Sequence, residues 1–277
     1  EAALTLAADA TAQEFAAKHG RIGGSELLIL GLGRLGGGAL THASDLDIVY
    51  LFTGDFAAQS DGLRPLGATI YYNRLASRVS AALSVPTAQG ALYEVDTRLR
   101  PQGNQGPLAV SCEAFGKYQR EAAWTWEHMA LTRARVLYGS AGARAALEGV
   151  LAEVLHAPRG KAMLRDAVLS MRAEMARHKQ PGGPIDAKLM RGGLVDLEFL
   201  VHYLQLKGET AGGTPLAEAQ PAALDPDLAV ALGGLAAAGI LPADLAQPHA
   251  LMSRMLVAGR LLAPDGHEPP PSGARAL

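Results

Sequence analysis

The chain has 277 residues, of which 49% are hydrophobic, and a formal net charge of -2 at pH 7. This length suits one large domain or two ordinary ones, and the near-neutral charge argues against a general binder of nucleic acid or of anionic membranes. The single cysteine, Cys112, cannot form an internal disulfide and fits a reducing cytoplasm. The longest weakly polar stretch, Leu228–Leu241, is too short for a bilayer span of about 20 residues, and we expect no signal peptide.

The first part of the chain alternates helical and extended patterns. Short apolar runs bounded by glycine or polar residues predict buried strands, and apolar residues at helical spacing predict helices. We expect a helix over residues 1–20, strands over 26–30 and 45–52, a helix over 67–83, a strand over 91–99, a helical turn at 39–41 and a short strand at 108–110.

A further helical pattern follows Ser111, which we predict to be its N-cap. One apolar stripe runs along it, formed by Phe115, Tyr118, Ala122, Trp126 and Met129. Core packing is therefore the expected role of Trp126, with contact to a partner as the alternative. Trp124 and His128 are four residues apart and are spaced to stack on each other.

From about residue 139 onward the pattern is helical only. We predict helices over 141–156, 160–179 and 195–207, two more within 221–263 separated by Pro242, and a loose tail over 264–277. A mixed first part and an all-helical second part predict the fold class α+β, with two domains at residues 1–140 and 141–277.

A glycine-rich turn, Gly31-Leu-Gly-Arg-Leu-Gly-Gly-Gly38, follows the first predicted strand. It satisfies the G-x-G-x-x-G pattern, which alone is weak evidence for a dinucleotide site. Such a site needs a full helix after the turn and an acidic residue at the end of the second strand, whereas Asp45 and Asp47 stand at its start. We therefore favour backbone N–H groups that receive a triphosphate, with Ser44 nearby. The structural alternative is a tight turn that needs positive φ.

Three aspartates are candidates for metal binding. Asp45 and Asp47 point to the same side, because strand side chains alternate. Two close carboxylates repel each other unless a cation lies between them, and Mg²⁺ favours carboxylate oxygens together with substrate phosphates. If the strand of Asp96 is adjacent, Asp96 completes a site for two metal ions, which stabilises the entering and leaving oxygens of an in-line displacement. For Asp45 and Asp47 alone, a solvated strand start is the alternative.

Several other polar residues have a structural as well as a functional interpretation. Arg98 and Arg100 alternate with Asp96 and are suited to grip phosphates, unless they only pair with the carboxylates. Asp96 is also a candidate acceptor for the proton of an attacking hydroxyl. In the second part of the chain, Lys188 is a candidate phosphate contact. Asp196 is a candidate helix cap, and Glu198 a candidate for a buried ion pair.

A set of segments in a fixed order carries a resemblance to a known family. They are Gly31–Gly37, Ser44–Ile48, Asp96–Pro101, Gly106–Leu108, Glu121–His128, Arg133–Arg135 and Arg191–Phe199. Together they resemble the nucleotidyltransferase superfamily, and more closely the glutamine synthetase adenylyltransferases. The resemblance implies a polymerase-β-like mixed sheet with helices, followed by an all-helical domain.

Enzymes of that family have two related halves. The C-terminal half transfers AMP from ATP to a tyrosine of glutamine synthetase, and the N-terminal half removes it by phosphorolysis. The segment Ala122–Leu131 resembles the adenylylating half, which is the activity that we predict. Gly38 departs from the family pattern, in which a bulkier residue is expected at this position.

The resemblance also implies roles for particular residues. The metal carboxylates are expected to be Asp45, Asp47 and Asp96, holding two Mg²⁺ ions, with Mn²⁺ as an alternative. The ATP phosphates are expected along the glycine turn and Ser44, at Gly33, Gly36, Gly37 and Ser44. The expected partners are glutamine synthetase and, in the full-length enzyme, the PII signalling protein, with no nucleic acid and no membrane.

Three other functions remain open on sequence alone. One is the adenylyl-removing phosphorylase of the same family, and another is a non-enzymatic module that binds nucleotide or PII. The third is a nicotinamide-dependent dehydrogenase that uses the glycine turn. The three aspartates argue against a module without catalysis.

Overall fold

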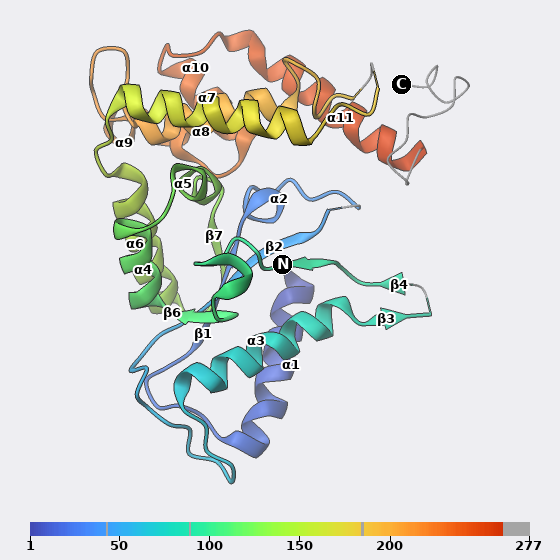
Figure 1. Cartoon of the computed structure of the whole chain (residues 1–277), viewed down its shortest axis with the longest axis vertical. Helices are drawn as coiled ribbons and strands as arrows, with labels where there is room; N and C mark the ends of the chain where they lie inside the picture. The colour runs from blue at the N-terminus through green and yellow to red at the C-terminus, as the bar shows by residue number, and fades with distance from the viewer. Residues whose placement is uncertain (43, 89, 184–185, 263–277) are drawn as a thin grey trace. The chain divides into compact units, whose positions relative to one another are not determined.

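The computed structural model describes residues 1–42, 44–88, 90–183 and 186–262. The chain divides into two compact units (Figure 1), of which the first comprises Glu1–Leu40 and Ser44–Val154. The second begins at Leu155 and also takes in the short segment that starts at Thr41. The predicted domain boundary at residues 140/141 precedes α6 (Ala141–His156), whereas most of α6 lies in the first unit.

The first unit is built on a mixed five-stranded sheet. Its strands are β1 (Leu27–Gly31), β2 (Leu46–Phe52), β5 (Val95–Asp96), β6 (Ala109–Ser111) and β7 (Arg135–Tyr138). The order is β5-β2-β1-β7, and β6 also pairs with β2. β1 is antiparallel to β2 and β7, whereas β2 is parallel to β5 and β6. The two strands predicted at 26–30 and 45–52 are confirmed, as is the mixed α/β character of this part.

Two helices, α1 (Ala2–His19) and α3 (Ala68–Ser84), cover one face of the sheet. The sheet presents to them every second residue of the central strands, including Ile29 and Ile48. Aromatic contacts join the layers, because the rings of Phe52 and Tyr72 stack with centroids 4.7 Å apart. Each fully buried leucine, valine or phenylalanine in this layer contributes about 1.5–3 kcal/mol to folding.

The structure differs from the predicted elements around the site. Of the strand predicted at 91–99, only β5 joins the sheet; β4 (Gly90–Ala91) pairs instead with β3 (Pro86–Thr87) in a separate hairpin. The helical turn expected at 39–41 lies earlier, as α2 (Gly33–Gly36), inside the glycine run. β7 was not predicted, because its short apolar run follows directly on a helical pattern.

The helix predicted to follow Ser111 begins there, since the Ser111 hydroxyl accepts a hydrogen bond from the Ala114 amide at 3.1 Å. It is not continuous, however. α4 (Cys112–Glu121) ends before α5 (Thr125–Leu131), because the buried carboxylate of Glu127 accepts hydrogen bonds from the Trp124 amide and the Tyr118 hydroxyl.

This break reorients the two tryptophans. Trp124 is 71% exposed and Trp126 is 41% exposed. The predicted core packing of Trp126 is therefore wrong. The stacking of Trp124 on His128 stays a prediction; the His128 ring donates through Nε2 to the Gln119 carbonyl.

Among the described residues of the second unit, the regular elements are helices and no named strand occurs, as predicted. Its helices are α7 (Lys161–His178), α8 (Leu194–Lys207), α9 (Leu216–Ala219), α10 (Leu228–Ala237) and α11 (Ala246–Leu262). Its core is centred on Val201, Leu216 and Leu235, which are fully buried. Among the described helices of the chain, none combines the length and the apolar character that crossing a membrane requires. The predicted tail at 264–277 lies outside the described residues.

Candidate active site

The sheet brings the three predicted aspartates together. β2 and β5 run parallel, and their register places Asp47 directly beside Asp96. Asp45 precedes β2 by one residue and shares the side of the strand on which Asp47 lies. One oxygen of each of the three carboxylates lies within 4.8 Å of the others. Asp45 is exposed, whereas Asp47 and Asp96 are half-buried.

The arginines nearby balance the negative charge of these carboxylates only in part. Burial, together with the charges of Asp45 and Asp96, raises the pKa of Asp47 to about 6; Arg133 and Arg98 lower it only in part. A site with three oxygen-bearing anions, at the sheet edge and open to solvent on one side, has the donor set that Mg²⁺ prefers. The residues present therefore fit a divalent cation.

Arg98 already offsets the negative charge of one of the three carboxylates, that of Asp96. Its backbone amide donates to the Asp96 carboxylate at 2.8 Å, and its guanidinium donates to both carboxylate oxygens. The hydrogen bond from the Arg98 side chain is the main cause that holds the pKa of Asp96 below its ordinary value. The alternative weighed for Arg98, pairing with a carboxylate, is observed.

Arg100 has a different environment from the one expected for a phosphate ligand. Its guanidinium donates to the Thr97 carbonyl at 2.8 Å and to the Gly106 carbonyl at 3.3 Å. These bonds close the loop that follows β5. The expected alternation of Arg98 and Arg100 on one strand fails because the strand ends at Asp96. A phosphate contact by either arginine stays a prediction.

The glycine turn touches the acidic cluster directly. The Leu32 amide donates to the Asp47 carbonyl at 2.9 Å. Gly33 has a φ of +52°, and a Cβ added there would lie 2.1 Å from Oδ2 of Asp47. Only glycine satisfies both conditions. A Cβ at Gly36 would lie 1.9 Å from the Arg133 carbonyl, so the segment that precedes β7 also packs closely against the turn.

The N–H groups of the turn are not equally available. The Gly36 amide donates to the Leu32 carbonyl at 2.7 Å, and the Gly37 amide to the Gly33 carbonyl at 3.1 Å. Within the described residues the Gly33 amide has no acceptor. The phosphate contacts predicted for Gly36, Gly37 and Ser44 stay predictions, and Gly33 has the better placed N–H group.

Arg135 donates hydrogen bonds to the glycine turn, and no role was predicted for it from the sequence. Its guanidinium donates to the carbonyls of Gly36 at 2.5 Å and Leu35 at 3.2 Å, and to the Glu1 carboxylate at 2.6 Å. The bond to Gly36 satisfies a carbonyl at the C-terminal end of the short α2, whereas the Leu35 carbonyl also accepts from the Gly38 amide. The only signal in the sequence was that Arg135 belongs to one of the segments that carry the family resemblance.

Lys188 belongs to the second unit. Its backbone lies in a turn where the Asp186 carboxylate accepts from the Lys188 and Leu189 amides. Asp196 accepts from the Gly192 amide at 2.6 Å and from Arg172. It lies in the first turn of α8, whose N-cap is Gly193 without a side-chain hydrogen bond, so the predicted capping role is not observed. The phosphate contact of Lys188 stays a prediction.

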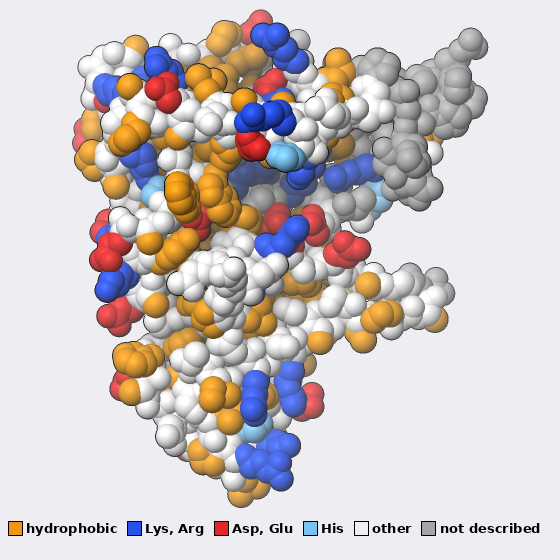
Figure 2. Space-filling view, in the orientation of Figure 1, with side chains coloured by type: hydrophobic (Ala, Val, Ile, Leu, Met, Phe, Trp, Pro, Cys, Tyr) orange, Lys and Arg blue, Asp and Glu red, His pale blue; other side chains and the backbone are white. Residues whose placement is uncertain are grey.

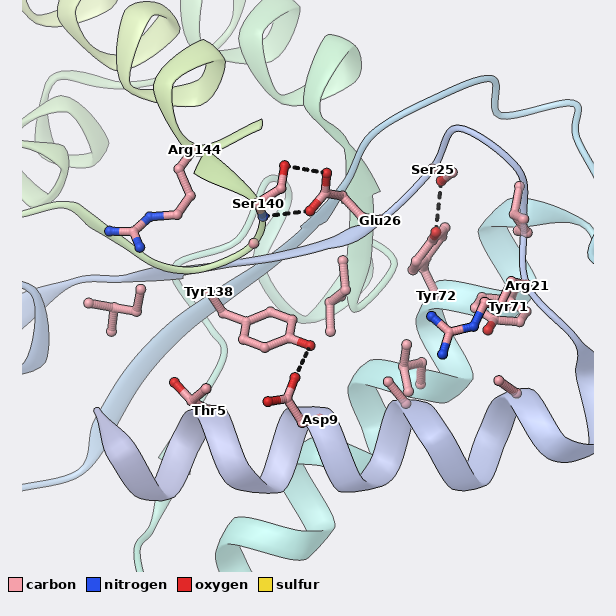
Figure 3. Close-up of a pocket in the computed structure, with 17 residues that line it drawn as sticks. Thr5, Asp9, Arg21, Ser25, Glu26, Tyr71, Tyr72, Tyr138, Ser140 and Arg144 are labelled. Atoms are coloured by element: carbon pink, nitrogen blue, oxygen red, sulfur yellow. Dashed lines mark hydrogen bonds between the residues drawn. The ribbon is translucent and has the colours of Figure 1, made fainter. Parts of the chain in front are cut away.

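A separate pocket of about 450 Å³ lies in the first unit (Figure 3), between α1, α3 and the connection from β7 to α6. Its polar groups pair with one another: the Tyr138 hydroxyl donates to Asp9, and the Ser140 amide and hydroxyl donate to Glu26. None of the predicted site residues lines it. We therefore place the candidate active site at the acidic cluster.

Comparison with known proteins identifies the family of the chain. The family model described as Glutamate-ammonia ligase adenylyltransferase matches residues 1–150, which include the whole acidic cluster and the glycine turn. Glutamate-ammonia ligase is glutamine synthetase.

The similar curated proteins are named Bifunctional glutamine synthetase adenylyltransferase/adenylyl-removing enzyme. The one from Mesorhizobium japonicum is 45% identical over 211 residues, which are 76% of this chain and 21% of the relative. The one from Brucella suis is 47% identical over 203 residues, 73% of this chain and 21% of the relative. The one from Bradyrhizobium diazoefficiens is 40% identical over 242 residues, which are 86% of this chain and 23% of the relative.

The chain thus spans about a fifth of the length of these relatives. The matched family model covers more than half of the chain, including every element of the mixed sheet. On these grounds the chain belongs to the glutamate-ammonia ligase adenylyltransferase family.

Proposed function

We propose that this chain carries an adenylyltransferase site that moves AMP from ATP to a tyrosine of glutamine synthetase and releases pyrophosphate. One observation carries the proposal: three carboxylates within 4.8 Å of one another, on adjacent parallel strands, in contact with a glycine turn. The family match and the printed names of the relatives supply the reaction class and the protein substrate.

In this proposal Asp45, Asp47 and Asp96 hold Mg²⁺, as two ions, with Mn²⁺ as the alternative. Bound there, the metal would polarise the α-phosphate and offset the charge on the entering and leaving oxygens. Arg98 keeps Asp96 ionised at neutral pH, which suits a metal ligand and makes it a poor proton acceptor. This weakens the earlier expectation that Asp96 takes the proton of the attacking hydroxyl.

The glycine turn is proposed to receive the ATP phosphates. The Gly33 amide is the best placed donor, because it lies beside Asp47 and has no acceptor within the described residues. Arg135 and β7 hold the turn in place, so its geometry is fixed before the nucleotide binds. A fixed donor loses less conformational entropy when it meets its ligand.

The adenylyl-removing reaction is the second candidate, because the relatives' printed names include both activities. The same groups would serve it with inorganic phosphate as the attacking species and ADP as the product. Regulation by PII and a cytoplasmic location also remain proposals.

The test is transfer of label from α-³²P-ATP, with Mg²⁺, to unmodified glutamine synthetase. We expect label on the target with the unmodified chain and with Asp244→Asn, a matched change at an exposed aspartate outside the site. Asp45→Asn should lose it. Equal labelling by Asp45→Asn would refute the role of the cluster. Release of ADP from adenylylated target by phosphate, without forward labelling, would assign the removing reaction instead, and ATP binding without either reaction would indicate a regulatory module.

A further inference from the structure

Basic side chains from three segments gather around a pocket of about 580 Å³ in the first unit. They are Lys18 in the last turn of α1, Arg64 in the loop before α3, and Arg74 and Arg78 on α3. Figure 2 shows Lys and Arg side chains around a histidine at the lower end of that view. This pocket lies on the α1–α3 side of the sheet, whereas Asp45 and Asp47 project from the other side of β2.

Most of these cations have no counter-ion. Within the described residues, Lys18, Arg64 and Arg74 make no side-chain hydrogen bond or ion pair, and Arg78 has only a 3.7 Å contact with Glu14. The chain has a net charge of -2, so the cluster does not reflect a general excess of basic residues. Lys18 also complements the C-terminus of α1, but Arg64 in a loop and Arg74 inside α3 gain nothing from a helix dipole.

The loop that carries Arg64 is fixed to α1. The His19 ring donates through Nδ1 to the Arg64 carbonyl at 2.7 Å, and the Arg64 amide donates to the Lys18 carbonyl at 3.3 Å. The Gly62 amide donates to the His19 carbonyl at 3.0 Å, and a Cβ at Gly62 would lie 2.1 Å from the His19 carbonyl carbon. Folding therefore forces like charges together, at an electrostatic cost that an anion would relieve.

The shape and chemistry of the pocket indicate the kind of anion. Its volume is in the range of small-molecule sites, and Phe15 and Leu66 give it an apolar wall. The Arg78 guanidinium lies over the Phe15 ring, 5.1 Å from its centroid, which restricts its position. Guanidinium groups bind phosphate oxygens through paired hydrogen bonds. We propose that this pocket binds a small anion that carries phosphate groups and at least two negative charges.

The test is calorimetric titration of the full chain with inorganic pyrophosphate. Divalent metal is first removed on a chelating resin, so that the acidic cluster cannot recruit the probe through metal ions. The double variant Arg64→Gln/Arg74→Gln removes two exposed, unpaired cations. The control Lys117→Gln/Arg144→Gln removes the same charge from exposed positions outside the pocket.

We expect saturable binding that weakens about tenfold or more in the Arg64/Arg74 variant and stays within about twofold in the control. The Arg64/Arg74 variant should unfold at the same temperature as the unmodified chain or higher, because the substitutions remove repulsion between exposed cations, and the control should match the unmodified chain. No saturable binding, or an equal loss in both variants, would overturn the proposal. So would a glutamate-rich peptide that displaces pyrophosphate at lower concentration, since it would identify an acidic protein surface as the ligand.

Discussion

Replacing Asp47 by asparagine should stabilise the metal-free chain while abolishing its activity. The folded chain raises the pKa of Asp47 from 3.8 to about 6, through burial first and then the neighbouring carboxylates. Two pKa units correspond to about 3 kcal/mol between the two protonation states. Because the side chain is only half-buried and solvent screens part of its charge, we expect a gain of about 1–2 kcal/mol.

The sign follows from proton linkage. A raised pKa means that the folded chain binds this proton more tightly than the unfolded chain does. The penalty of ionised Asp47 is therefore absent below about pH 4, grows as pH rises toward 6, and is complete above it. The Asp47→Asn variant should gain stability at about pH 7.5 and little at about pH 4.

Urea unfolding followed by tryptophan fluorescence measures the stability of the first unit, which contains Asp47. The chain has two tryptophans, Trp124 and Trp126, and both lie in the first unit. Glu148→Gln is the matched control, because it removes one negative charge from an exposed site on α6. Added Mg²⁺ should stabilise the unmodified chain and have a smaller effect on Asp47→Asn. A variant that is less stable than the unmodified chain at neutral pH would refute the reasoning.

Other substitutions test the turn and the helix break. Gly33→Ala should remove ATP-dependent transfer and destabilise the first unit, because its φ is +52° and the new Cβ meets Asp47; Gly142→Ala, where a Cβ meets nothing, should leave transfer unchanged. Arg135→Gln should raise the KM for ATP more than it lowers kcat, with Arg144→Gln as the control; equal KM values would contradict a positioning role. Trp124→Ala should change the unfolding free energy by less than about 1 kcal/mol, because the ring is 71% exposed; a larger loss would show that the ring is packed.

The local part of the site was predictable from sequence. The apolar run of β2 and the two-residue spacing of Asp45 and Asp47 fix a shared side for these carboxylates without tertiary information. Asp96 was predicted only on the condition that its strand is adjacent. The register of β2 with β5 confirms that condition, although the strand is two residues long instead of nine.

The errors arise where hydrogen bonds made by side chains override the local apolar pattern. The stripe through Trp126 has helical spacing, but buried Glu127 binds the Trp124 amide and ends the continuity between α4 and α5. Arg135 was missed for a related reason. Its partners, the carbonyls of Leu35 and Gly36, lie about a hundred residues earlier, and no sequence pattern marks a side chain that closes a turn from another strand.

The strands that carry Asp47 and Asp96 differ in length and in their position in the sheet. Asp47 belongs to a seven-residue central strand with neighbours on both sides, whereas Asp96 ends a two-residue strand at the edge of the sheet. Edge strands with few hydrogen bonds open more readily than central ones. The site therefore combines one candidate ligand held in a central strand, Asp47, with one at the sheet edge, Asp96, whose position is more adjustable. Hydrogen exchange would register metal or nucleotide first as slower exchange at Val95 and Asp96, with β2 unchanged.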